Sequence, residues 1–209
     1  MGILTRDQIV QKIKKGEMGF EPGLDKFQLQ VHSVDLRLGF TFMVPKSWIM
    51  RPEGRVALNV HYGENRKNFD VVELEEGQYF EILPGEFVAV TTLERVKIPA
   101  GIMAILYPRS SVNRRGLSVD LSGVIDAGYE GQLLVPVRNN TISQVIRLYP
   151  GERFCQLVFE ELNDMTKKTS GRYQKKDVVV GVLREKSTRE ESLIKKGKIK
   201  ELKKLFQLG

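Results

Sequence analysis

Short runs of β-forming residues, separated by proline and glycine, recur along this 209-residue chain and are the feature that most restricts its fold. Seven such runs follow residue 28, at 34–44, 56–61, 79–83, 87–93, 101–106, 132–137 and 154–159. Many short strands with frequent turn signals are typical of a barrel or a sandwich. The sequence therefore predicts an all-β fold.

Two similar Pro-Gly segments support this prediction. Pro84-Gly85 and Pro150-Gly151 each separate two apolar runs and are each followed by Glu. Proline followed by glycine favours a tight turn, because proline fixes its own φ and glycine tolerates a positive φ. We therefore expect two similar corners in the sheet, rather than a repeat protein.

Helices are expected only at the two ends of the chain. Thr5 and Gln8 have the spacing of a capping box, and the short helix that they begin should end at Gly16 or Gly19. The apolar residues of the C-terminal segment fall on one helical face: Ile194, Ile199, Leu202 and Phe206. This segment is predicted to be a basic amphipathic helix.

The length and the apolar content favour one domain with a tail. A chain of 209 residues that is 41% hydrophobic can bury one substantial core, but it is short for two domains. We place this domain at residues 1–182 and the helical tail at 183–209.

The positive charge is concentrated in the tail. Residues 184–209 contain nine Lys or Arg and four Glu, and so they hold five of the seven net positive charges. A nearly balanced body with a basic end lacks the basic face that binds nucleic acid. No apolar run approaches the roughly 20 residues of a membrane span. We therefore expect neither nucleic acid nor membrane as a partner.

Cysteine and histidine are scarce. With Cys155 as its single cysteine, the chain can form no internal disulfide, which favours a cytoplasmic location. His32 and His61 do not have the spacing, with paired cysteines, of a zinc-dependent deaminase. Zinc-assisted deamination is therefore excluded.

Two motifs carry groups that suit a nucleoside triphosphate. The segment Pro108 to Ser111 offers a guanidinium and two hydroxyls, which are good partners for phosphate oxygens. The segment Gly123 to Gly131 offers the Asp126 carboxylate on a glycine-bounded hairpin, next to the aromatic Tyr129. Gln156 follows in a later strand. Together these residues predict a triphosphate pocket.

These motifs, with the segment 151–157, resemble successive motifs of the dUTP diphosphatase and dCTP deaminase superfamily. The segments 3–9 and 33–39 are more similar to the deaminase branch, and the resemblance extends over residues 1 to about 175. It implies a distorted jelly-roll fold, the dUTPase-like β-clip. It further implies a homotrimer with sites between subunits, a deoxypyrimidine triphosphate as substrate, and Mg²⁺ as cofactor.

The resemblance also implies roles for single residues around the sugar and the base. Asp126 would be the general base that activates water for attack on the α-phosphorus. Tyr129 would lie on the deoxyribose, and the backbone around Gly123 and Ile125 would recognise the base edge. Asp120 stands where diphosphatases often have an amide. Because an ionised acid cannot donate a hydrogen bond, Asp120 could change the preference between uracil and cytosine.

A further group of residues is implied for the phosphates and the metal. The phosphates would be held by Arg109, Ser110, Ser111, Arg114 and Gln156. Asp35 would organise the waters of Mg²⁺ or a subunit contact. Arg172 and Tyr173 would belong to a lid over the phosphates and the base.

Pro136 decides between the two branches in this interpretation. Deaminases of the superfamily have a proton-carrying glutamate on the strand after the hairpin, and Pro136, which has no such group, stands at that position. The prediction is therefore a dUTP diphosphatase that forms dUMP and pyrophosphate. One alternative is a dCTP deaminase, with a different proton carrier or with both activities, and another is a nucleotide sensor without turnover.

Overall fold

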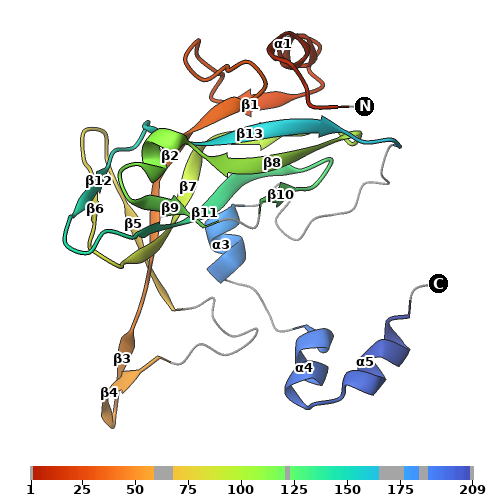
Figure 1. Cartoon of the computed structure of the whole chain (residues 1–209). Helices are drawn as coiled ribbons and strands as arrows, with labels where there is room; N and C mark the ends of the chain where they lie inside the picture. Colours follow the sequence, from red (N-terminus) through yellow and green to blue (C-terminus); the bar gives the residue numbers. More distant parts are fainter. Residues whose placement is uncertain (1, 59–67, 121–122, 165–176, 184–187, 208–209) are drawn as a thin grey trace. The chain divides into compact units, whose positions relative to one another are not determined.

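The structure is a computed structural model that describes residues 2–58, 68–120, 123–164, 177–183 and 188–207. The chain divides into two compact units (Figure 1). The larger comprises Met1–Val44 and Val71–Val178, and the smaller comprises Pro45–Asp70 and Val179–Gly209. All the predicted site residues that the structure describes belong to the larger unit.

One large sheet dominates the described residues (Figure 1). Its nine strands are β1 (Gly19–Glu21), β2 (Val34–Pro45), β5 (Phe69–Glu73), β7 (Phe87–Lys97), β8 (Ile102–Pro108), β9 (Leu117–Val119), β10 (Val124–Ile125), β11 (Glu130–Asn139) and β13 (Arg153–Glu161). The main path through the sheet is β10-β8-β13-β2-β7-β11-β9, while β1 pairs with β7 and β5 pairs with β2. The all-β prediction is confirmed.

The first and last strands of this path are neighbours in sequence. β9 ends at Val119 and β10 begins at Val124, so four residues lie between them, and the five steps from one Cα to the next span at most about 18 Å. The same path laid flat would separate β9 and β10 by about 29 Å, because neighbouring strands lie about 4.8 Å apart. The sheet must therefore curl until its two edges approach each other.

The interior of the curled sheet forms the apolar core. Along β11, buried side chains alternate with more exposed ones, as expected for a strand with one face on the core. Phe42, Phe154 and Phe159 are among its largest fully buried side chains. Cys155 is also buried, and desolvation raises the pKa of its thiol well above the ordinary value.

The two predicted Pro-Gly corners follow the strands of a small sheet. β6 (Phe80–Ile82) pairs antiparallel with β12 (Ile146–Leu148). The next turns contain Gly85 and Gly151, whose φ values are +75° and +87°. In each turn the amide two residues after the proline donates to the carbonyl of the residue before it, at 3.0 Å. The expectation of two similar corners is confirmed.

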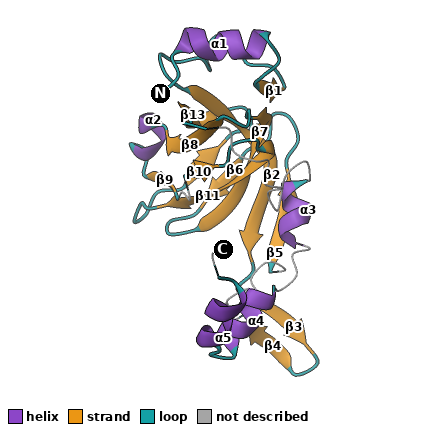
Figure 2. Ribbon diagram, turned by 90° about the vertical axis from the view of Figure 1, so that its right-hand side faces the viewer, coloured by secondary structure: helices purple, strands orange, loops and turns teal. Residues whose placement is uncertain are grey.

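The N-terminal helix has the predicted cap. α1 (Arg6–Lys14) begins after Thr5, whose amide donates to Gln8 Oε1 at 2.8 Å. The helix ends before Gly16, which has a φ of +70°. Its residue Ile9 is fully buried. Figure 2 shows α1 at one end of the sheet, near β1.

The expected single C-terminal helix is two short helices. α3 (Val178–Leu183) is followed by α4 (Arg189–Lys195) and α5 (Ile199–Leu205). Gly197 has a φ of +67°, and the Lys198 amide donates to the Leu193 carbonyl at 2.9 Å, which is the arrangement of a glycine C-cap. Gly197 therefore ends α4 and divides the segment.

The smaller unit also contains a hairpin of β3 (Trp48–Arg51) and β4 (Gly54–Ala57). The strand predicted at 56–61 overlaps β4, but its residues 59–61 lie outside the described residues. Within the described part of the chain, no helix combines the length and the apolar character that crossing a membrane requires.

Gly116 controls the path from the predicted phosphate motif to β9. It follows α2 (Ser110–Asn113) and has a φ of +83°. A Cβ at this position would lie 2.5 Å from Thr141 Cγ2. The Thr141 hydroxyl donates to Asn139 Oδ1 at 2.7 Å, and this hydrogen bond limits rotation of the side chain. Both the backbone angle and the available space therefore require glycine.

We expect Gly116→Ala to destabilise the protein more than Gly77→Ala. Gly77 has a φ of +86° but open space around its missing Cβ, so alanine there costs only the backbone strain, about 1–2 kcal/mol. Urea unfolding of both variants measures the difference. Adding Thr141→Ser, which removes the crowding methyl group, should recover the excess loss of Gly116→Ala. Equal losses for the two alanine variants would contradict the steric argument.

Candidate functional site

Four polar side chains gather where β2, β13 and the end of β8 lie side by side. We call Asp35, Arg109, Arg153 and Gln156 the arginine cluster. Asp35 on β2 is the register partner of Gln156 on β13, which in turn pairs with Tyr107 on β8. Residues far apart in the sequence are thus brought into one row across three strands.

Asp35 is the centre of the arginine cluster. Its side chain is only 2% exposed, and its Oδ2 forms a salt bridge with Arg109 Nε at 3.0 Å and accepts a hydrogen bond from Arg153 Nη1 at 3.1 Å. Burial raises the pKa of the Asp35 carboxyl, and the two arginines oppose that rise by stabilising the ionised form. Asp35 therefore fixes two cations where the ends of β2, β8 and β13 lie side by side.

Arg109 is held rigidly at the start of α2. Besides its contact with Asp35, its Nη1 donates to the Arg153 carbonyl at 3.2 Å. Ser110 and Ser111 follow it on the helix, and both are exposed. Two nitrogens of the guanidinium are therefore engaged within the protein. The predicted binding of phosphate by Arg109 therefore depends on the third guanidinium nitrogen, Nη2.

Gln156 lies beside the same helix start, and Arg114 lies at the other end of the helix. Gln156 Nε2 donates to the Pro108 carbonyl at 3.3 Å, and its Oε1 accepts from Ser33 Oγ at 3.0 Å. Arg114 is the exposed C-cap residue of α2. The structure thus brings together Arg109, Ser110, Ser111 and Gln156, and their role toward phosphates stays a prediction.

Arg153 was not among the site residues predicted from the sequence. Arg153 lies in the quoted segment 151–157, but nothing local in that segment shows that its guanidinium reaches a carboxylate 118 residues earlier in the chain. The pairing depends on β13 lying next to β2. Only the strand order of the folded sheet could have revealed it.

We expect Asp35→Asn to lower the free energy of unfolding by about 1–3 kcal/mol, because two guanidiniums lose their shared counter-charge. The arginine side chains are 25% and 27% exposed, and solvent screening keeps the loss below that of a fully buried pair. Denaturant unfolding provides the measurement.

Asp25→Asn is the matched control for this variant. Asp25 pairs with Arg37 at 2.6 Å, but its side chain is 43% exposed, so its loss should cost no more than about 1 kcal/mol. Equal losses in the two variants would refute a structural role that is special to Asp35.

The second group of predicted residues lies on the hairpin around β10. Gly123 has a φ of +52°, and its carbonyl accepts from the Leu106 amide at 2.7 Å. Ile125 is buried and pairs with Ala104, which anchors the hairpin to β8. Asp126 follows it and is exposed. The hairpin thus presents the carboxylate to solvent from a fixed backbone.

Tyr129 packs against the core at the end of this hairpin. Its hydroxyl donates to the Gln132 carbonyl at 2.6 Å, and burial raises its pKa to about 12. A Cβ at Gly131 would lie 2.9 Å from the Tyr129 hydroxyl, so glycine leaves room for the ring. These contacts account for Tyr129 as a packing residue, and its role under a sugar stays a prediction.

The structure separates the hairpin acid from the arginine cluster. Ile125 pairs with Ala104, five residues along β8 and its continuation from Arg109, which corresponds to about 16 Å. Asp126 lies one residue beyond Ile125. A single chain therefore does not bring Asp126 and Arg109 into direct contact.

The predicted roles of Asp35 toward the waters of Mg²⁺ and of Arg172 and Tyr173 as a lid stay predictions. The described residues contain no cluster of three or more His, Cys, Asp or Glu side chains that could hold a metal ion. Asp35 does not fit a direct Mg²⁺ ligand, because its carboxylate already binds two guanidiniums. Arg172 and Tyr173, the predicted lid residues, lie outside the described residues.

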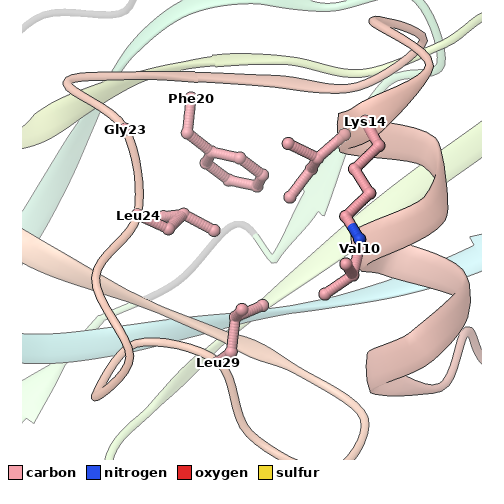
Figure 3. Close-up of a pocket in the computed structure, with 7 residues that line it drawn as sticks. Val10, Lys14, Phe20, Gly23, Leu24 and Leu29 are labelled. Atoms are coloured by element: carbon pink, nitrogen blue, oxygen red, sulfur yellow. The ribbon is translucent and has the colours of Figure 1, made fainter.

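A separate apolar cavity lies beneath α1 (Figure 3). Its volume is about 240 Å³, and it is lined by Val10, Ile13, Lys14, Phe20, Gly23, Leu24 and Leu29. None of these residues was predicted for the nucleotide. A mostly apolar lining does not suit a triphosphate, so this cavity is distinct from the candidate site.

The curled antiparallel sheet, with a cation cluster and an acidic hairpin on one unit, defines an all-β protein with a polar candidate site. A family model described as dCTP deaminase-like matches residues 3–162. The chain belongs to that family.

Named relatives agree with this assignment. The chain is 37% identical over 179 residues to a dUMP-forming dCTP deaminase of Aquifex aeolicus, covering 85% of this chain and 92% of the relative. It is 38% identical over 177 residues to a dUMP-forming dCTP deaminase of Sulfurihydrogenibium sp., covering 82% of this chain and 92% of the relative.

A solved structure, the 2′-deoxycytidine 5′-triphosphate deaminase of Agrobacterium tumefaciens, matches with a TM-score of 0.59 at 27% identity. The match covers 76% of this chain, but the chain spans only about half the length of that protein, 48%. The prediction of the dUTP diphosphatase and dCTP deaminase superfamily is therefore confirmed.

These relatives overturn the predicted activity. The predicted activity was that of a plain dUTP diphosphatase, because Pro136 lacks a proton-carrying group, whereas the named relatives are dUMP-forming dCTP deaminases. That choice was wrong, since it rested on the residue at one strand position.

Proposed function

We propose that the protein converts dCTP to dUMP. The reaction consumes two water molecules and releases one ammonia and one pyrophosphate. Similarity over 85% of the chain to a relative named dUMP-forming dCTP deaminase is the observation that carries this proposal. Forming dUMP from dCTP requires both a deamination and the removal of pyrophosphate, so the site must perform both.

Asp126 activates the water that attacks the α-phosphorus after deamination. Its exposure and its position on a hairpin held by Gly123 and Ile125 support this role, because a general base must be fixed and accessible. The attack breaks the bond between the α-phosphorus and the bridging oxygen, and pyrophosphate leaves. The backbone of the same hairpin recognises the base edge.

The arginine cluster holds the phosphates. Arg109 offers a guanidinium that Asp35 keeps in place, and Ser110 and Gln156 add neutral hydrogen-bonding groups next to it. A Mg²⁺ ion held by the substrate phosphates would neutralise part of their charge, and Asp35, whose carboxylate already pairs with two guanidiniums, would not bind it directly. Since the chain has a single, buried cysteine, a reducing cytoplasm suits this enzyme.

Each complete site forms between copies of the chain in a homotrimer. The separation of about 16 Å along β8 between the hairpin and Arg109 supports this arrangement. A second copy that presents its own Asp126 to the arginine cluster would complete the site. This assembly makes hydrolysis depend on contact between subunits.

Asp126→Asn should stop the second half of the reaction and spare the first. With dCTP as substrate, we expect ammonia release to continue while pyrophosphate release falls by about 10²-fold to 10⁴-fold, because the amide cannot accept a proton from water. Separate assays for ammonia and pyrophosphate measure the two steps. Unchanged pyrophosphate release would refute the role of Asp126.

Mixing two inactive variants tests the site between subunits. Asp126→Asn and Arg109→Gln should each lose pyrophosphate release, and subunit exchange should restore activity in about one quarter of the sites, those that take each intact residue from a different copy. Native mass spectrometry verifies that exchange has occurred. Mixed oligomers without recovered activity would show that both residues act within one chain.

A further inference from the structure

The proposed deamination needs a group that carries protons, and Pro136 on β11 has no side-chain group that can do so. Pro136 stands in the middle of this strand, opposite Ala89 of β7 on one side. On its other side the Asp120 amide donates to the Pro136 carbonyl at 2.9 Å. Because proline has no amide hydrogen, this pair is joined by a single hydrogen bond. The chain just after β9 therefore lies directly against Pro136.

The register of β9 and β11 fixes the direction of the Asp120 side chain. Val137 pairs with Val119, and Arg138 pairs with Ser118, so the next pair in this register is Pro136 with Asp120. Side chains of directly opposed residues point to the same face, with Cβ atoms about 5 Å apart. The carboxylate of Asp120 therefore projects from the same face as the side chain at position 136.

The immediate surroundings keep the Asp120 carboxylate in place without burying it. Asp120 is exposed, and Ser118 Oγ donates to its Oδ1 at 2.9 Å. Among the described residues, its Oδ2 makes no hydrogen bond or ion pair, so one oxygen stays free to exchange a proton. Asp120 also lies three residues before Gly123, where the proposed base-recognising hairpin begins.

The two halves of the proposed reaction need two separate acids. C4 of cytosine and the α-phosphorus lie at opposite ends of a nucleotide, with the sugar between them. A carboxylate that activates water at the phosphorus cannot at the same time exchange protons with the amino group of the base. Asp126 is assigned to the phosphorus, and the base end requires another group.

We propose that the Asp120 carboxylate is the proton carrier for deamination and takes the place of the glutamate that related deaminases have at the position of Pro136. This inference rests on the proposed conversion of dCTP to dUMP. It gives Asp120 a catalytic role in addition to the predicted effect on the choice between uracil and cytosine.

The proton balance of this step closes with one carboxylate. Asp120 takes a proton from water as the water oxygen forms a bond to C4, and it gives that proton to N3. It then takes the second proton from the new hydroxyl at C4 and gives it to the amino group. The bond between C4 and the amino nitrogen breaks, ammonia leaves, and C4 keeps a carbonyl. Asp120 ends ionised, as it began.

Asp120→Asn tests the proposal, since the amide keeps the shape and removes the proton exchange. We expect ammonia release from dCTP to fall by about 10²-fold to 10⁴-fold. A urea-unfolding midpoint equal to that of the wild type shows that the variant is folded, so the lost ammonia release is not a loss of structure. Ammonia release at the wild-type rate in Asp120→Asn would overturn the assignment.

A glutamate at position 136 provides the positive control. Adding Pro136→Glu to Asp120→Asn should restore ammonia release, because a carboxylate then returns to the same face from the opposite strand. Adding Pro136→Gln, which also restores the backbone amide but carries no proton, should not. Recovery with glutamine would overturn the proposal by showing that the backbone, and not a carboxylate, was limiting.

The same assays separate this inference from the function on which it rests. Wild-type protein that releases no ammonia from dCTP would refute the proposed function, and the role of Asp120 with it. Wild-type protein that releases ammonia, with an Asp120→Asn variant that matches it, would refute only the role of Asp120.

Discussion

Closure of the sheet is the constraint on which the rest of the structure depends. The strands at its two edges, β9 and β10, are separated by so few residues that the sheet has to curl around its core. Direct pairing of β9 with β11 places Asp120 against Pro136, and the short connection that closes the sheet leads from Asp120 to the hairpin at β10. Local sequence patterns do not link Asp120 with Pro136.

Local chemistry made the corners and the first helix predictable. Thr5 with Gln8 and the two Pro-Gly pairs each act through neighbours three residues away, so their effect is visible in the sequence. The very short β9 and β10 have too few residues for a clear alternation pattern. The contact of Asp35 with Arg153 and the pairing of Asp120 with Pro136 depend on strand order and register, which a linear pattern does not specify.

The corrected activity shows how a single position can mislead. Proline at 136 does remove a proton-carrying side chain, and that inference from its chemistry is sound. The error was to treat the strand position as the unit of function. In an antiparallel pair, the directly opposed residue presents its side chain on the same face with its Cβ about 5 Å away, so a carboxylate there can reach a group that a side chain at the first position would reach.

The reactivity of Cys155 can be used to measure how often the sheet opens. It is the only cysteine in the chain, it lies in the centre of the sheet on β13, and its thiol is both inaccessible and difficult to ionise. A thiolate-selective reagent can therefore modify it only when β13 separates from its neighbours. The rate of labelling therefore measures how often β13 separates from its neighbours, without the introduction of another cysteine.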